Sequence, residues 1–164
     1  MKKYLLMLIA FSFLAGASCQ QKTDSDKEMK ALADKSIEVW NGGSLSLFDE
    51  ILSSEYVYHG NDAIDIIGID ASKERVTSIR TSFPDFKVTL NELIITGDKG
   101  VVRWTMTGTN TGPFGELPPT GKKISVSGVN ISHVVDGKIS ENWQFYNQAL
   151  FYTQLGFTLT PPEE

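Results

Sequence analysis

The feature that most constrains the fold is a change of apolar spacing at Phe86. Before that residue, apolar side chains recur at helical spacing; after it, β-branched and polar residues alternate as they do in strands. The spacing predicts helices over residues 25–40, 44–52 and 70–83, a brief strand over 55–59, and long strands over 87–96, 101–109, 122–135 and 138–147. Helices followed by long strands predict the α+β class, with the helices on one face of a curved antiparallel sheet.

Composition limits the class of protein. The chain has 164 residues, a formal charge of −5, one Cys and two His residues. The single Cys excludes an internal disulfide and a Cys-based zinc site, and the wide separation of the His residues excludes short-spaced His metal motifs. No run of Lys or Arg is long enough to follow a phosphate backbone. We therefore expect one acidic domain with no metal, no cofactor and no nucleic acid partner.

The N-terminal residues have the composition of a signal peptide. Two lysines precede an apolar run of roughly 11 residues, which is shorter than the about 20 that a membrane-spanning helix needs. Small residues then lead to Cys19, the only cysteine of the chain. The segment resembles a bacterial lipoprotein signal, which implies cleavage before Cys19 and lipidation of that residue.

The resulting organisation is a signal peptide over residues 1–18, a polar tether over 19–25 and a folded domain over 26–164. The expected location is the cell envelope, where a membrane-anchored lipoprotein faces the periplasm or the cell exterior. Plain secretion with an ordinary cleavage and an uncleaved anchor are the alternatives.

The turn at Asp136-Gly137 decides which side chains of the last hairpin share a face. A three-residue loop pairs Val134 with Lys138, whereas a two-residue turn pairs Val135 with Lys138. Only the three-residue register separates apolar from polar residues, so we expect that register. Its apolar face holds Val129, Ile131, His133, Ile139, Glu141, Trp143, Phe145 and Asn147, and its polar face holds Asn130, Ser132, Lys138, Ser140, Asn142, Gln144 and Tyr146. We expect the apolar face to meet the helices.

Three polar residues on that apolar face, His133, Glu141 and Asn147, are the candidate catalytic residues. Buried polar groups need partners, which a polar ligand or water in a pocket can supply. Glu141 is expected diagonal to His133, within reach of its imidazole, and a His–Glu pair can transfer a proton. The structural alternative is that Glu141 is solvated at the rim and that His133 is a core residue bonded to a backbone group.

Motifs in the second half of the chain follow the order of a known family. They are Ser82-Phe83-Pro84-Asp85, Arg103-Trp104, Gly108-Thr109, Pro119-Thr120-Gly121-Lys122, Asp136-Gly137-Lys138-Ile139, Glu141, Trp143 and Gln154-Leu155-Gly156. This set resembles the SnoaL-like polyketide cyclases and ester cyclases of the NTF2-like superfamily. The resemblance implies a cone-shaped α+β fold, a pocket between a curved sheet and about three N-terminal helices, and a homodimer formed through the outer face of the sheet.

The same resemblance reveals departures at the acid/base positions. The family's cyclases have Asp at the position of Asn147, His at that of Phe145 and Gln at that of Ile131, whereas His133 is kept. An amide does not change protonation at any useful pH, so Asn147 can donate or accept a hydrogen bond but cannot act as a general acid or base. Most of the family's proton-transfer groups are therefore replaced in this chain.

Aromatic, aliphatic and histidine residues around the expected pocket are the candidate ligand-binding residues: Tyr58, His59, Trp104, Ile131, Trp143 and Phe145. A surface position for His59 and a core position for Trp104 are the alternatives.

Two functions remain open. One is a non-catalytic pocket that binds an apolar small molecule in the envelope. The other is an acid/base enzyme of the cyclase, isomerase or hydrolase type, acting on a small carbonyl or ester compound. In that enzyme His133 would transfer the proton, Glu141 would orient it, and Asn147 or Tyr58 would hold an oxygen.

Overall fold

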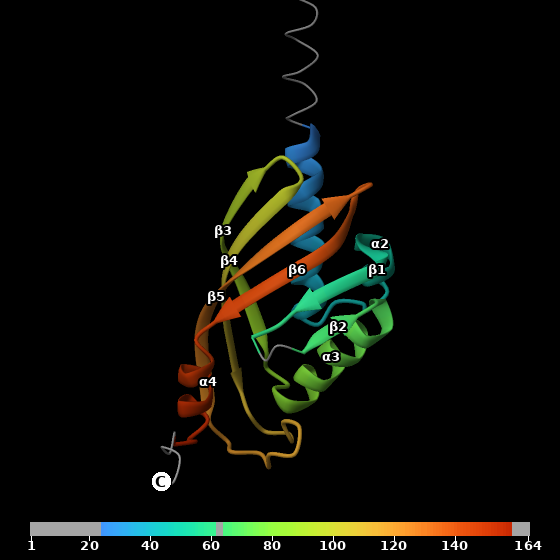
Figure 1. The fold of residues 1–164 in the computed structure, drawn as a ribbon. Coiled ribbons are helices and arrows are strands. Elements are labelled where there is room, and N and C mark those ends of the chain that lie inside the picture. The colour runs from blue at the N-terminus through green and yellow to red at the C-terminus, as the bar shows by residue number, and fades with distance from the viewer. Residues whose placement is uncertain (1–23, 62–63, 159–164) are drawn as a thin grey trace, which may run out of the picture.

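The computed structural model describes residues 24–61 and 64–158, and in them helices cover one face of a curved six-stranded sheet (Figure 1). Residues 24–40 form the first helix. The elements after it are α2 (Leu47–Ile51), β1 (Leu52–His59), β2 (Asp65–Ile67), α3 (Ile69–Ser82), β3 (Lys87–Thr96), β4 (Lys99–Thr109), β5 (Lys123–Val135), β6 (Lys138–Tyr146) and α4 (Gln148–Gln154). The predicted α+β class is confirmed, and β2 and α4 are elements that the spacing did not predict.

The signal peptide predicted over residues 1–18 and the lipidation site at Cys19 lie outside the described residues. Residues 24 and 25, at the end of the predicted tether, are part of the first helix. Within the described part of the chain, every helix is too short or too polar to cross a membrane.

The sheet is mixed rather than purely antiparallel. Its strand order is β2-β1-β6-β5-β4-β3, in which β1 runs parallel to β6 and every other neighbouring pair is antiparallel. The alternating sequence pattern could not give the direction of β1, because β1 and β6 are far apart in the chain. A row of paired residues crosses the whole sheet: Asp65, His59, Trp143, Ile131, Val101 and Ile94.

The predicted three-residue loop of the last hairpin is wrong. Asp136 and Gly137, with φ of 51° and 72°, form a two-residue turn that pairs Val135 with Lys138. Asp-Gly is the sequence that such a turn favours, since both residues take positive φ. A β-bulge follows, so that His133 pairs with Glu141 and the grouping of residues beyond the bulge is the one we expected. Ile139 lies before the bulge and therefore shares a face with Val134 instead.

The helices cover the face of the sheet opposite to the predicted one. Tyr58 and Ile139 are buried with Val39 of the first helix and Val76 of α3. Asn142 is also buried, whereas Phe145 on the other face is 56% exposed. The prediction considered only the end of the last hairpin near its turn, but the apolar side chains of the covered face also come from β1, β3, β4 and the first half of β5. We call this covered face the inner face and the opposite one the outer face.

Two apolar clusters pack between the inner face and the helices. The first joins the first helix, α2, α3 and β1, and contains Leu32, Val39, Phe48, Ile51, Leu52, Tyr56, Tyr58, Val76 and Ile139. The second joins β3, β4 and β5 to α4 and contains Phe83, Val88, Trp104, Met106, Ile124, Val126, Phe151 and Leu155. The partly buried Trp40 packs against both clusters, so it lies where they meet.

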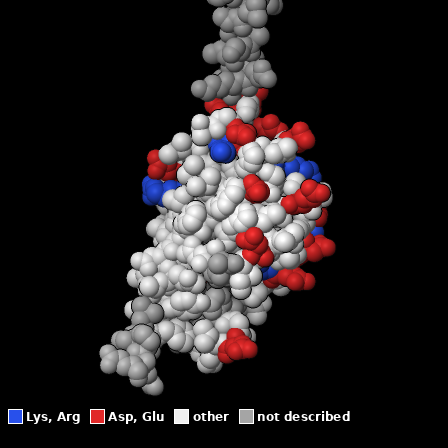
Figure 2. Space-filling model, viewed as in Figure 1, with Lys and Arg blue, Asp and Glu red and all other residues white. Residues whose placement is uncertain are grey.

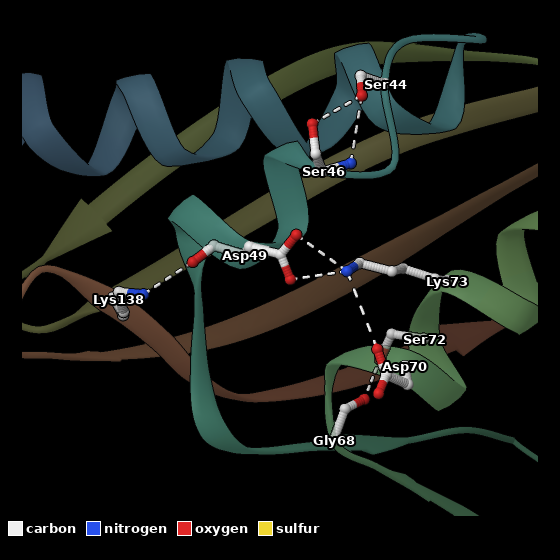
Figure 3. Close-up of polar contacts among 8 residues, drawn as sticks. All are labelled: Ser44, Ser46, Asp49, Gly68, Asp70, Ser72, Lys73 and Lys138. Carbon is white, nitrogen blue, oxygen red and sulfur yellow. Dashed lines mark hydrogen bonds and ion pairs between the residues drawn. The ribbon is translucent and has the colours of Figure 1, made fainter.

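Polar contacts join α2 to α3 and to the last hairpin (Figure 3). The ammonium of Lys73 contacts both carboxylate oxygens of Asp49, at 2.7 and 2.9 Å. Lys138 donates to the backbone carbonyl of Asp49 at 2.9 Å. At the start of α3, the hydroxyl of Ser72 donates to the carbonyl of Gly68 at 2.9 Å. Asp49 of α2 thus contacts both α3 and β6.

Charged side chains are unevenly distributed over the surface. In the view of Figure 1, acidic side chains gather where the first helix begins and along the side formed by α2 and α3 (Figure 2). The region around α4 carries almost none, in agreement with the uncharged sequence of that helix. On this face of the molecule, acidic side chains therefore predominate near the start of the first helix, and the region around α4 is nearly uncharged.

Candidate functional site

Arg75 of α3 lies at the centre of a polar group on the inner face. Its guanidinium carbon is 4.2 Å from the ring centroid of Tyr58 and 5.1 Å from that of Trp40. Its Nη2 donates to the Tyr58 hydroxyl at 2.7 Å and to Oε1 of Gln144 at 3.1 Å. The Tyr58 hydroxyl in turn donates to the same Oε1. Two neutral oxygens thus hold Nη2, and two aromatic rings further fix the position of the guanidinium.

Asn130 and Gln144 face each other across β5 and β6, and the amide orientation of both follows from their partners. The indole Nε1 of Trp104 donates to Oδ1 of Asn130 at 2.6 Å. Indole and guanidinium nitrogens are donors only, so each must meet an amide oxygen. The amide nitrogens of Asn130 and Gln144 therefore point away from these bonds and stay available as donors.

Gly128 allows the Trp104 ring to take this position. A Cβ at Gly128 would lie 2.4 Å from a ring carbon of Trp104 and 2.6 Å from the carbonyl oxygen of Phe145. No side chain fits in that space, because real Cβ contacts are longer. The glycine therefore lets the indole lie close to β5 and reach Asn130.

Arg75 has no carboxylate partner among the described residues. The ion pairs there involve other Lys, Arg and His side chains. The buried side-chain nitrogens without a hydrogen-bond partner belong to His59 and Arg80. The remaining N–H groups of Arg75, and the amide nitrogens of Asn130 and Gln144, are therefore accessible to solvent.

Tyr56 and Asn142 extend this polar group toward the first apolar cluster. Burial, reinforced by the neighbouring Tyr58, raises the pKa of the Tyr56 hydroxyl far above its ordinary value, although Arg75 opposes the shift. Asn142 accepts from the Ser132 hydroxyl at 2.9 Å. Tyr56 therefore stays protonated at physiological pH and serves as a hydrogen-bonding group rather than as a base.

His133 and Glu141 are brought together, but on the outer face. His133 Nε2 lies 2.6 Å from a carboxylate oxygen of Asp98, and Nδ1 lies 3.8 Å from one of Glu141. The hydrogen bond from His133 is the main cause that holds the pKa of Asp98 below its ordinary value. The two residues are close, but they lie directly opposite each other rather than diagonally, and the predicted position facing the helices is wrong. In the structural alternative, the backbone partner of His133 is wrong because the ring contacts the carboxylate of Asp98, whereas the Glu141 side chain is 40% exposed, as that alternative has it.

Asn147 is not joined to these residues. It precedes α4, and its Oδ1 accepts from the backbone N–H of Leu150 at 2.9 Å, which caps the helix. The side chain is exposed. Its position is explained by the start of α4, an element that we did not predict.

The six candidate ligand-binding residues are divided between the two faces. Tyr58 and Trp104 lie on the inner face and are buried. His59 stacks on Trp143 with ring centroids 4.9 Å apart, and its Nδ1 lies 2.8 Å from a carboxylate oxygen of Asp65. Ile131 pairs with Trp143, and Phe145 shares their outer face. The expectation of one pocket lined by all six is therefore wrong.

Sequence reasoning missed Arg75 and assigned Asn130 and Gln144 to the face away from the helices. A signal was present for Arg75: it precedes Val76 and lies four residues before Ile79, on the apolar side of a predicted helix. A cation on the apolar side of a helix needs polar or aromatic partners inside the protein. The inner face of the last hairpin gave no such signal, because polar residues such as Asn130, Asn142 and Gln144 are common there.

A hollow of about 510 Å³ opens on the surface beside α3, away from the inner face. Thr77, Ser78 and Thr81 of α3 line it together with Pro113 and Gly115 of the following loop. None of the candidate site residues takes part in it. Within residues 24–61 and 64–158, His, Cys, Asp and Glu side chains form no group of three that could hold a metal ion.

Comparison with known proteins gives a family and several structural relatives. Residues 30–155 match the sequence model of the SnoaL-like polyketide cyclases. TsrD from Streptomyces laurentii is 27% identical, with a TM-score of 0.72 over 79% of this chain and 96% of TsrD. AclR from Streptomyces galilaeus is 26% identical, with a TM-score of 0.70 over 84% of this chain and 86% of AclR.

The fold extends to more distant proteins. A protein with a ketosteroid isomerase-like fold from Catenulispora acidiphila is 13% identical, with a TM-score of 0.67 over 79% of this chain and 97% of that one. No curated protein sequence matches the chain.

Proposed function

This chain belongs to the family of SnoaL-like polyketide cyclases, and from that premise we propose that it binds a largely apolar small molecule over the inner face of its sheet. The observation that carries the proposal is the combination of Trp40, Tyr58 and Trp104 with accessible donors of Arg75 and Gln144. Aromatic surfaces with a few fixed polar groups are typical of small-molecule sites.

Binding is favoured over proton transfer because of where the titratable groups lie. His59 and His133 are on the outer face, and so is Glu141. The polar residues described on the inner face are amides, hydroxyls and a guanidinium, none of which exchanges a proton readily near neutral pH. An acid/base enzyme that uses His133 would need a substrate site on the outer face.

The test is a thermal-shift screen of the full chain with bicyclic carbonyl compounds, beginning with 2-tetralone and naphthalene-2-carboxamide, together with native mass spectrometry of the protein as purified. We expect stabilisation by at least one compound. Absence of any stabilising compound and of any retained small molecule would contradict a binding function.

The enzyme alternative has a separate test. The α-protons of 2-tetralone exchange with deuterium when a base removes them, and NMR in D₂O measures the rate. We expect exchange at the rate of buffer alone. Acceleration that disappears in His133→Ala would support the acid/base enzyme instead, since a positioned acid/base group typically contributes about 10²-fold or more.

We also propose that the protein is a lipoprotein of the cell envelope, cleaved before Cys19 and held at the membrane by lipid on that residue. The lysines, apolar run and small residues that precede Cys19 support this. Since the chain has a formal net charge of −5, attraction to anionic lipid would not hold it there, and the anchor must do so.

A homodimer through the outer face is proposed as well. The row of paired residues that crosses the sheet there includes His59, Trp143, Ile131, Val101 and Ile94. Ile94 is 53% exposed and Phe145, beside the row, is 56% exposed. Exposed apolar side chains such as Ile94 and Phe145 are typical of an interaction site.

A further inference from the structure

We propose that the ligand of the inner face is a small, largely apolar carboxylate, and that Arg75 binds its anionic group. This inference rests on the proposed binding function and adds the chemical class of the ligand. Three observations carry it: the Nε and Nη1 donors of Arg75 that the described residues leave unused, an excess of donors around the guanidinium, and a cation without a counter-charge.

The guanidinium of Arg75 is held by hydrogen bonds through one nitrogen only. Nη2 makes both of its protein hydrogen bonds, to Tyr58 and Gln144. The rings of Trp40 and Tyr58 further restrict its orientation. A guanidinium has five N–H donors in a planar fork that matches the two oxygens of a carboxylate. Nε and Nη1 of Arg75 make no hydrogen bond with the described residues, so each is a charged donor from which an anionic oxygen can accept.

The neighbouring groups add donors rather than acceptors. The oxygens of Asn130 and Gln144 are occupied by Trp104 and by Arg75 with Tyr58. Their amide nitrogens make no hydrogen bond with the described residues and are accessible. A ligand at this place meets N–H groups almost exclusively, so an acceptor-rich group satisfies it and a donor-rich group does not.

Comparison of the three arginines shows that Arg75 lacks a compensating group. Arg103 on the outer face contacts the carboxylate of Glu92 at 3.1 Å. Arg80 donates to the carbonyls of Val39 and Gly43 at the end of the first helix, where the helix dipole is negative. Arg75 contacts only neutral oxygens and aromatic rings among the described residues. A partly buried cation of this kind favours an anionic ligand.

The experiment compares two probes of the same shape on the full chain at pH 7: naphthalene-2-carboxylate, which is ionised, and naphthalene-2-carboxamide, which is neutral. Isothermal titration calorimetry gives both Kd values. We expect the carboxylate to bind at least tenfold more tightly. Arg75→Gln should bring the ratio of the two Kd values close to one, and Arg75→Lys, which keeps the charge but loses the fork, should give an intermediate ratio.

Arg103→Gln is the matched control, because it removes the same charge from the outer face, and the ratio should not change. If circular dichroism shows that Arg75→Gln does not fold, the ratio of the two Kd values in the wild-type chain and in Arg75→Lys still tests the carboxylate proposal. Equal binding of both probes, or a preference that survives Arg75→Gln, would overturn the carboxylate proposal while leaving the binding function in place. If neither probe binds but another compound of the screen does, the carboxylate proposal alone is overturned. If no compound binds, the carboxylate proposal and the proposed binding function are both overturned.

Discussion

The guanidinium of Arg75 lies over the ring of Tyr58, 4.2 Å from its centroid, and also donates to the hydroxyl of that residue at 2.7 Å. Arg75 comes from α3 and Tyr58 from β1, so this contact joins a helix to the inner face of the sheet. Because the hydroxyl also donates to Gln144 of β6, one tyrosine orders a cation and an amide together.

Tyr58→Phe removes the hydroxyl that connects Arg75 to Gln144. We expect the free energy of unfolding to fall by about 1 to 2 kcal/mol, because two partly buried polar groups each lose a partner. Urea denaturation measures the change. Tyr152→Phe is the control: its hydroxyl makes no hydrogen bond with the described residues, and we expect a change within about 0.5 kcal/mol. Equal effects of the two substitutions would contradict the proposed role of the Tyr58 hydroxyl.

Asn147→Ala removes the cap of α4, and we expect a loss of about 1 kcal/mol in stability. Asn147→Asp should retain the stability, because a carboxylate also accepts from the Leu150 N–H and suits the positive end of the helix dipole. Neither substitution should alter the affinity for naphthalene-2-carboxylate. A large loss of affinity in Asn147→Ala at unchanged stability would instead assign Asn147 to the ligand site.

The pH dependence of the Asp98–His133 contact has a definite sign. The pKa of Asp98 is lowered in the folded protein, chiefly by the hydrogen bond from His133. A lowered carboxyl pKa stabilises the folded state above the unfolded pKa, near the ordinary 3.8, and this contribution is lost as the pH falls through the folded value. His133→Phe should therefore raise the pKa of Asp98 toward 3.8 and make acid unfolding less steep.

NMR titration of the side-chain carboxyl signals measures this change, and Asp85 provides an internal control. The pKa of Asp85 is lowered mainly by the Thr109 hydroxyl, which donates to it at 2.7 Å. Its titration should not move in His133→Phe. An unchanged Asp98 pKa in that variant would show that the His133 contact is not the cause of the shift.

Ile94→Lys should dissociate the proposed homodimer, because it places a charge at an exposed apolar position of the outer face. Light scattering coupled to size-exclusion chromatography gives the mass of the particle. Val135→Lys places the same charge at a similarly exposed position next to the hairpin turn and should leave the dimer intact. A wild-type chain that is monomeric at every concentration would refute the dimer.

Cys19→Ala tests the lipid anchor. We expect the variant to leave the membrane fraction of the native host and to lose the mass of the lipid, while the wild-type chain stays in that fraction. Equal membrane association of the two proteins would contradict lipidation of Cys19.

The α+β class and most element boundaries could be predicted from the sequence because they depend on local spacing. β3 runs over the predicted residues 87–96, since alternation and the flanking turns are both local signals. The direction of β1 could not be predicted in this way, because its neighbour β6 comes about 80 residues later and their pairing is a tertiary contact.

The site was predicted less well because burial of a strand face depends on what covers it. His133, Glu141 and Trp143 share a strand face with Val129, Ile131 and Phe145. Because that set is mostly apolar, it predicted that this face would be buried under the helices. The helices instead cover Tyr58 and Gln144, which bond each other and Arg75, and Asn130, which accepts from Trp104. Asn147 resembled a replaced catalytic acid, but the unpredicted α4 gives it a capping role.

The central claim is that ligand binds on the inner face, and the three tryptophans of the chain report on both faces. Trp40 and Trp104 lie toward the inner face, whereas Trp143 stacks with His59 on the outer face. The measurement is a titration of the full chain with naphthalene-2-carboxylate, followed by the indole N–H signals in ¹H–¹⁵N NMR spectra and assigned with Trp143→Phe. We predict saturable shifts of the Trp40 and Trp104 signals with the Trp143 signal unmoved; a shift confined to Trp143 would contradict the account.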